Sequence, residues 1–334
     1  MKEKNYYYSL DLFRGFCGYG VAICHLNAFA YGNEFMEYLS LIFVEFFFVL
    51  SGFVLYPQLL KVINKKKNLF IFYKRRWMRT LPLYLLTLIL VSILTNHMFD
   101  VNFFKYLFLI QKFLPNFIIN DYFPVAWSLS IEELFYLLFP LILIFLNHKN
   151  FLKVSMLIFV FLISFKYFFS NNVDPNFYRT GTFLRFDAIL FGFLIAHFKL
   201  VILKYKKNII FFTIIAISIF LFSYEFFTIN KNDSDNRFLF ILFMQLISSL
   251  TLFSFLLLEP LFKYSDKIKK LSLIISQQTY SIYLFHLIII YVFIKIKLSI
   301  YIATPTYIFL LFFISSLIYN LFEKPLLKQR PKIS

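Results

Sequence analysis

Residues 9–31 read SLDLFRGFCGYGVAICHLNAFAY, and this stretch indicates the class of fold. Its length fits a membrane-spanning helix, which needs about 20 apolar residues. It nevertheless contains Arg14 and His25, eleven residues apart, so about three helical turns place both side chains on one face. Because an ionisable side chain inside a membrane is costly, we expect this face to have a function. The structural alternative is a snorkelling arginine and a histidine that bonds a neighbouring helix.

The composition predicts an all-α, polytopic integral membrane protein. Hydrophobic residues make up 60% of the 334 positions and charged residues 15%, whereas soluble domains are about 25% charged. We expect one domain over residues 1–334, with about ten transmembrane helices and a short interfacial or re-entrant piece at 103–111. The predicted spans are 9–31, 38–60, 80–97, 127–146, 152–169, 183–199, 208–227, 238–258, 271–292 and 300–321.

The distribution of basic residues predicts the orientation. With the N-terminus inside, the inner segments hold 24 of the 34 Lys and Arg residues. We therefore expect both termini to be cytoplasmic. The formal charge of +17 then reflects topology and attraction to anionic lipid, and we expect no nucleic-acid partner. The five histidines lack the spacing of metal ligands, so we expect no metal site.

The segment 61–79 is the most basic part of the chain. It ends in an R-x-x-R pattern, Arg76 and Arg79, which we place on the first turn of the predicted span that begins at residue 80. Residues three apart share a helix face, and two guanidiniums on one face can bind a phosphate group. The alternative is an ordinary basic loop that contacts lipid.

Two adjacent carboxylates, Glu132 and Glu133, follow Trp127 near the outer end of another predicted span. Helical rise places them about 8–9 Å below the outer surface, in the same layer as His25. A carboxylate beside an imidazole can orient it and raise its basicity. The alternative is that the two glutamates only stabilise the helix start.

Other polar side chains interrupt the apolar spans and are candidates for contact with substrate. Interhelical hydrogen bonds and internal ion pairs are the alternatives for these groups. The candidates are Glu45, Trp127, Tyr136, Arg185, Asp187, Tyr283 and His286.

Seven motifs in this order resemble the type 3 acyltransferase family of polytopic membrane proteins, over nearly the whole chain. They are LDLFRGFCGYGVAICH, VEFFFVLSGF, RRWMRTLPLY, AWSLSIEELFYLLFP, LRFDAILFG, TYSIYLFH and FEKP. One departure is Glu45, where the family more often has aspartate. Some relatives carry a C-terminal SGNH-type domain, and the resemblance here is to the form without it.

The resemblance implies transfer of an acyl group, usually acetyl from acetyl-CoA, to a hydroxyl of an extracytoplasmic sugar. It implies a catalytic role for His25, and it associates Arg14 with His25 and Arg76 and Arg79 with the nucleotide of CoA. We add Glu132 or Glu133 as the group that orients His25, and Arg14 as a further possible phosphate ligand. A general base and a transient acyl-histidine are both compatible with these residues.

The sequence therefore predicts an O-acyltransferase in the bacterial inner membrane. Its partners would be acyl-CoA, a cell-surface polysaccharide or lipid-linked sugar, and membrane lipids, with no permanently bound cofactor. The alternative is a transporter of polysaccharide or lipid-linked sugar without chemistry. A purely structural scaffold would leave the intramembrane charges unexplained.

Overall fold

A computed structural model describes residues 6–118, 121–146, 150–230, 232–262 and 264–331. All regular structure in these ranges is helical, as the composition predicts. Contacts divide the chain into two compact units, which we describe separately. The first consists of Met1–Phe47, Lys199–Tyr224 and Met244–Phe322, and the second of Phe48–Phe198, Glu225–Phe243 and Glu323–Ser334.

The helices of the first unit come from the start of the chain and from its second half. They are α1 (Tyr8–Tyr31), the start of α2 (Glu34–Asn64), α9 (Lys199–Ile202), η3 (Leu203–Tyr205), α10 (Lys206–Phe222), the end of α12 (Ser234–Leu257), α13 (Glu259–Phe262), α14 (Asp266–Ile296), α15 (Ile300–Ile318) and most of the π-helical turn η4 (Tyr319–Glu323).

The second unit contains the middle of the chain and its C-terminal end. Besides the rest of α2 and the start of α12, it holds α3 (Asn68–Leu94), α4 (Val101–Leu107), α5 (Ala126–Leu146), α6 (Phe151–Phe169), α7 (Pro175–Thr180), η2 (Phe183–Arg185), α8 (Phe186–His197), most of α11 (Tyr224–Ile229) and α16 (Lys324–Lys328).

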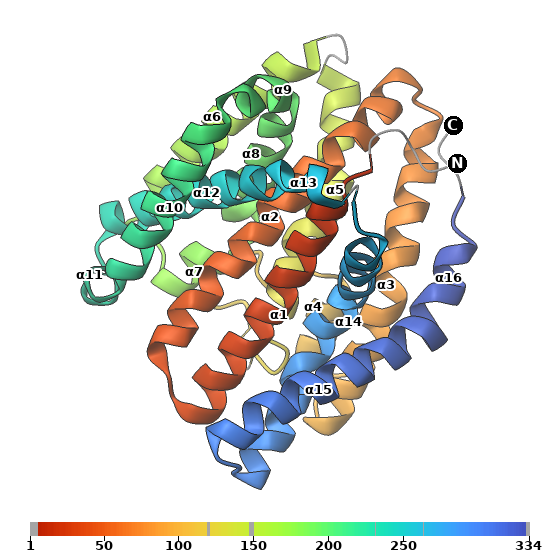
Figure 1. Cartoon of the computed structure of the whole chain (residues 1–334), viewed down its shortest axis with the longest axis vertical. Helices are drawn as coiled ribbons and strands as arrows, with labels where there is room; N and C mark the ends of the chain where they lie inside the picture. The colour runs from red at the N-terminus through yellow and green to blue at the C-terminus, as the bar shows by residue number, and fades with distance from the viewer. Residues whose placement is uncertain (1–5, 119–120, 147–149, 231, 263, 332–334) are drawn as a thin grey trace. The chain divides into compact units, whose positions relative to one another are not determined.

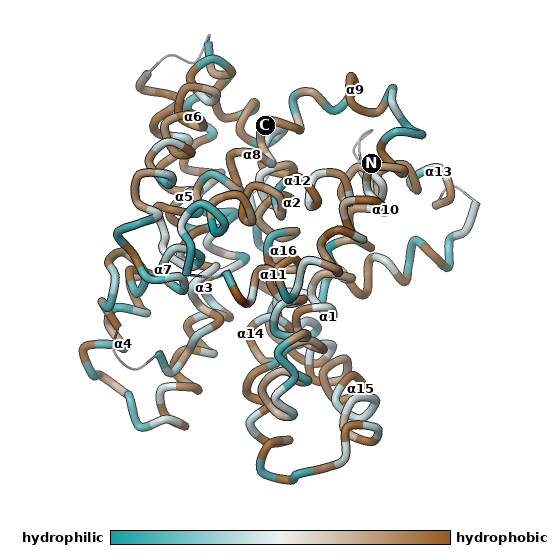
Figure 2. The backbone as a smooth tube through the Cα atoms, turned by 90° about the vertical axis from the view of Figure 1, so that its left-hand side faces the viewer, coloured by the Kyte–Doolittle hydropathy of each residue, from teal (hydrophilic) through white to brown (hydrophobic). Residues whose placement is uncertain are grey.

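Eight helical segments of the described chain are long and apolar enough to cross a membrane. They are Glu34–Asn64, Asn68–Leu94, Ala126–Phe145, Phe151–Phe169, Lys199–Phe222, Ser234–Phe262, Asp266–Ile296 and Ile300–Lys328. Figure 2 shows hydrophobic residues along most of the helical path. The class of fold is thus confirmed as all-α and polytopic.

Two of the ten predicted spans differ from these eight segments. The first is α1, which has 24 residues but carries Asp11, Arg14 and His25 among its apolar positions. The other was predicted at 183–199. It is a 3-10 turn followed by α8, whose 12 residues span only about 18 Å, against a hydrocarbon core of about 30 Å.

The third span begins earlier than its hydropathy suggests. Helix α3 starts at Asn68, so Arg76 and Arg79 lie well inside it rather than on its first turn. The sequence prediction placed this helix start too late, because four basic residues at 74–79 resemble a loop when hydropathy alone is considered. Long basic side chains can extend away from a helix while their stems cover apolar surface, so they do not end it. The predicted short piece at 103–111 corresponds to α4.

Helix α1 packs along α14 in the first unit, and α14 in turn packs against α15 (Figure 1). Small residues make the first contact close. A Cβ atom on Gly15 would lie 2.1 Å from Cγ2 of Ile275, which is too near for any real side chain. This packing brings the polar face of α1 against the polar positions of α14.

In the second unit, α2 and α8 meet through two glycines. A Cβ atom on Gly52 would lie 1.8 Å from the carbonyl oxygen of Ile189, and one on Gly192 would lie 2.1 Å from that of Val49. Each helix therefore touches the backbone of the other, as small residues permit in membrane proteins.

Candidate active site

The first unit brings two histidines into contact across the α1–α14 interface. Nδ1 of His25 lies 2.9 Å from Nε2 of His286, and the two rings stack with centroids 5.1 Å apart. His286 is completely buried, whereas His25 is partly exposed. The partly exposed ring is therefore the one that can meet a substrate.

The surroundings of His286 determine where the protons of this pair lie. Its Nδ1 is 2.8 Å from the carbonyl oxygen of Tyr283 and 3.2 Å from that of Ile282. A carbonyl only accepts hydrogen bonds, so Nδ1 carries the proton, and Nε2 of the neutral ring is an acceptor. Nδ1–H of His25 then donates to His286. As a result, Nε2 of neutral His25 carries no proton and is the basic nitrogen of the ring.

A second polar group joins the same two helices nearer the N-terminus of α1. Ser276 Oγ donates to Asp11 Oδ1 over 2.7 Å, and Arg14 Nη1 lies 3.3 Å from Ser276 Oγ and 3.5 Å from Asp11 Oδ1. The hydroxyl of Tyr6 also bonds Asp11. Arg14 thus shares a carboxylate with two hydroxyl groups, and it keeps 21% of its side chain exposed.

Two further predicted residues belong to this unit. The ring of Tyr283 lies 6.3 Å from that of His286, centroid to centroid, and its side chain is partly exposed. Glu45 lies on α2 and is buried at 2% exposure. Tyr283 therefore lies beside the histidine pair, and Glu45 places a carboxylate inside the unit.

In the second unit, α2, α3 and α5 meet at a polar network around Tyr136. The guanidinium of Arg76 lies over the Tyr136 ring, 4.0 Å from its centroid. Glu132 accepts a hydrogen bond from Ser51 Oγ over 2.7 Å and a long one from the Tyr136 hydroxyl over 3.5 Å. The network links a predicted phosphate ligand to a predicted catalytic carboxylate through one aromatic ring.

Glu133 and Arg76 are also close enough to interact electrostatically. Glu133 is buried at 5% exposure, and the charges of Arg76 and Glu132 both act on its carboxylate. The arginine stabilises a negative charge at this position, and the neighbouring glutamate opposes it. The two glutamates therefore differ in their surroundings, since Glu132 accepts from Ser51 and Tyr136 and Glu133 is the more deeply buried of the two.

The predicted substrate residues Arg185 and Asp187 are almost completely buried, at 1% exposure each. Asp187 forms an ion pair with Lys166 of α6, which is itself completely buried. Arg185 lies over the ring of Phe48, 5.5 Å from its centroid. The pair Lys166–Asp187 joins α6 to α8 inside the unit.

Trp127 packs between a phenylalanine and an arginine in the same unit. Its ring lies 5.7 Å from that of Phe48, and the guanidinium of Arg179 lies 5.5 Å from its centroid. Trp127 is partly exposed at the start of α5. The partly exposed indole ring of Trp127 therefore has the cation of Arg179 beside it.

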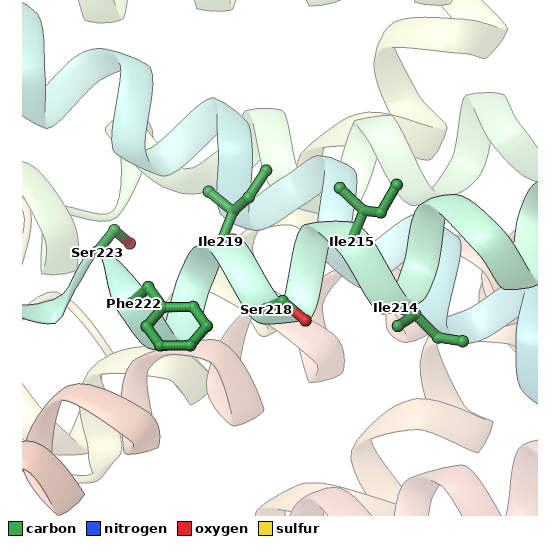
Figure 3. A pocket seen from close by; sticks show the side chains of 6 residues that line it. All are labelled: Ile214, Ile215, Ser218, Ile219, Phe222 and Ser223. Atoms are coloured by element: carbon green, nitrogen blue, oxygen red, sulfur yellow. The ribbon is translucent and has the colours of Figure 1, made fainter.

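The open surface hollow in Figure 3 lies elsewhere, along α10 of the first unit. None of its lining side chains is titratable, which leaves it without acid–base chemistry. They are Ile214, Ile215, Ser218, Ile219, Phe222 and Ser223. A hollow of this composition on a membrane-spanning helix suits a lipid chain.

The described contacts group the predicted site residues into two sets. His25, His286, Tyr283 and Arg14 share the α1–α14 interface, and Arg76, Tyr136, Glu132 and Glu133 share the α3–α5 region. The pairing of His25 with Glu132 or Glu133 crosses from one unit to the other and stays a prediction.

Sequence reasoning missed three features. It did not give His286 a role toward His25, it assigned no partner to Lys166, and it overlooked Arg330. The sequence could have suggested the contact between the two histidines, because His25 and His286 each interrupt an apolar span. The other two depend on contacts between distant parts of the chain, which spacing does not reveal.

Residues 7–320 match the family model described as "Acyltransferase domain". Because this match covers nearly the whole chain, the protein belongs to this acyltransferase family. The O-acetyltransferase OatA of Staphylococcus aureus is 30% identical over 319 residues, covering 86% of this chain and 51% of OatA. An uncharacterized protein of Haemophilus influenzae is 33% identical over 180 residues, covering 46% of this chain and 73% of the relative.

This chain thus spans about half the length of OatA. No solved structure matches it.

Proposed function

We propose that this protein is a membrane O-acyltransferase that moves an acyl group, acetyl in the first instance, from acyl-CoA to a hydroxyl group of a cell-surface polysaccharide or glycolipid. The observation that carries the proposal is the hydrogen bond between His25 and His286, because it places the proton of neutral His25 on Nδ1 and makes Nε2 the basic nitrogen. Family membership and the relationship to an O-acetyltransferase support the same reaction.

In this mechanism, Nε2 of His25 takes the proton of the acceptor hydroxyl as its oxygen attacks the thioester carbonyl. A C–O bond forms, the C–S bond breaks, and the leaving thiolate takes the proton back from His25. The products are an ester and free CoA. His286 accepts from Nδ1–H throughout, so it is a positioning residue that keeps the reactive nitrogen in place.

A second route uses the same nitrogen as a nucleophile. Nε2 of His25 would attack the thioester carbonyl and release CoA as a thiolate. The acceptor hydroxyl would then attack the acyl-histidine, which forms the ester, frees His25 and passes the hydroxyl proton to the thiolate. Rapid acid quench with radiolabelled acetyl-CoA in the absence of acceptor separates the routes. Label that stays on the protein and disappears in His25→Ala indicates the covalent intermediate, and label that stays only on CoA indicates direct transfer.

For the donor, we propose that Arg76 and Arg79 bind the phosphate groups of CoA on the cytoplasmic side, with Arg14 as a further cation. Guanidiniums bind phosphate through paired, charge-assisted hydrogen bonds. The stacking of Arg76 on Tyr136 supports this assignment, since it holds one guanidinium in place without using its hydrogen-bond donors.

For the acceptor, we propose an approach from the extracytoplasmic side. Trp127 and Tyr283 are partly exposed aromatic residues of the kind that stack on sugar rings. Glu45, Tyr136, Arg185 and Asp187 are buried, so we propose that they shape the acceptor path rather than contact the sugar from its open end. Glu132 or Glu133 would assist the base.

We also propose cytoplasmic termini and an inner-membrane location.

The test is release of free thiol from acetyl-CoA by the purified protein, with and without an acceptor glycan. His25→Ala should abolish the release, and His197→Ala is a matched control because His197 is an exposed histidine at the end of α8 that bonds Tyr56 instead. Export of a labelled glycan without thiol release would favour the transporter alternative.

A further inference from the structure

The C-terminal segment brings another arginine to the basic part of α3. Helix α16 packs against α3, and Nη1 of Arg75 donates to the carbonyl oxygen of Pro331. Arg330 lies between these two anchor points in the chain. Its side chain is partly buried in the second unit, together with the arginines of α3.

These arginines act on one another electrostatically. The pKa of Arg330 is lowered to about 10, mainly by burial and further by the charges of Arg79, Arg75 and Arg76. It still carries its charge at neutral pH. The guanidiniums of Arg75, Arg76 and Arg79 are therefore near enough to repel that of Arg330, and this repulsion costs free energy.

The buried donors of this cluster are incompletely used. Nε of Arg330 and both Nε and Nη2 of Arg76 find no hydrogen-bond acceptor among the residues that the structure describes. A buried, charged donor without an acceptor is costly, so such donors point to an anion that binds there. An anion with several negative charges would also relieve the repulsion among the four guanidiniums.

We propose that Arg330 is a fourth arginine of the donor site, so that Arg330 and the arginines of α3 together bind the phosphate groups of a multiply phosphorylated nucleotide. The proposal rests on the proposed function, since CoA carries a diphosphate and a separate 3′-phosphate. It goes beyond that function by making the C-terminal segment a part of the donor site. The phosphate of an anionic lipid has the same chemistry, and the experiment distinguishes the two.

The experiment is titration of the full chain with CoA in neutral detergent, for the parent and for Arg330→Gln, Arg330→Lys and Lys328→Gln. Arg330→Gln should weaken CoA binding about tenfold or more, because a charge-assisted phosphate contact is lost. Arg330→Lys should recover part of the affinity, since it keeps the charge but not the planar fork. Lys328→Gln removes one charge from an exposed position of the same segment and should stay within about twofold of the parent.

Each result decides the matter. CoA binding by Arg330→Gln equal to the parent's, alongside weakened binding by Arg76→Ala/Arg79→Ala, would overturn this proposal and leave the proposed function intact. If Arg330→Gln binds CoA like the parent but no longer co-purifies with phosphatidylglycerol in native mass spectrometry, Arg330 binds the lipid instead. A parent that does not bind CoA would overturn the proposed function as well. An unchanged melting temperature of Arg330→Gln shows that the variant folds.

Discussion

Nδ1 of His25 is hydrogen-bonded to Nε2 of His286, and His286 is in turn held by backbone carbonyl oxygens of its own helix. A neutral imidazole thus takes the orienting place that a carboxylate has in many base-activating pairs. The arrangement avoids placing a further negative charge inside the membrane. It also makes the protonation state of one ring depend on the hydrogen bonds of the other.

Replacing His25 tests the base directly. His25→Ala should lower acyl transfer by about 10²–10⁴-fold, the usual contribution of a positioned general base. CoA affinity should stay near that of the parent, because the phosphate ligands are elsewhere in the chain. Thiol release and CoA titration on the same preparation measure both. Transfer within a few-fold of the parent would exclude His25 from the chemistry.

Replacing His286 tests positioning. His286→Leu removes the acceptor for Nδ1–H of His25 and should reduce turnover at least about tenfold with little change in CoA affinity. His286→Gln offers an amide oxygen near the place of Nε2 and should recover part of that loss. The recovery separates positioning from packing, because leucine and glutamine are similar in size. Equal turnover of the two variants would argue against the hydrogen bond.

The arginine pair of α3 should affect the donor alone. Arg76→Ala/Arg79→Ala should weaken CoA binding strongly, since each charge-assisted bond to phosphate contributes about 1.5–3 kcal/mol. The double lysine variant should recover part of this affinity. Calorimetry at constant salt concentration is the measurement, because phosphate contacts are screened by salt. If the double alanine variant binds CoA normally, these arginines serve topology only.

The glycine contact between α2 and α8 should matter for stability. Gly52→Ala and Gly192→Ala each place a Cβ atom within about 2 Å of a backbone oxygen, so the helices must separate. We expect a lower melting temperature in detergent for both variants. Ser218→Ala, on the open hollow of α10, is the control and should leave it unchanged. Parent-like melting of both glycine variants would show that the helices are less tightly packed.

Orientation is tested by labelling from outside the cell. Ile118→Cys should react with an impermeant maleimide, and Lys66→Cys should not, because the basic segment 61–79 is predicted to be cytoplasmic. Cys17 and Cys24 are buried and should stay unlabelled. The opposite pattern would reverse the proposed sides of donor and acceptor.

The sequence was sufficient for the helical class, because long apolar stretches leave few other structures in a membrane. It also located Arg14 and His25 on one helix. It misplaced the start of α3, since Lys74, Arg75 and Arg76 hide a continuous helix from a hydropathy plot. It could not pair His25 with His286, which lie 261 positions apart. Such pairings follow from packing between helices, which a single sequence does not specify.

The ion pair between Lys166 and Asp187 has a consequence for how the protein enters the membrane. An unpaired charged residue on an inserting helix costs free energy, and α8, with 12 residues, is too short to compensate with its own apolar length. Once paired, the lysine and the aspartate neutralise each other. We therefore expect α6 to be retained at the translocon until α8 is synthesised, so that the two helices enter the lipid together.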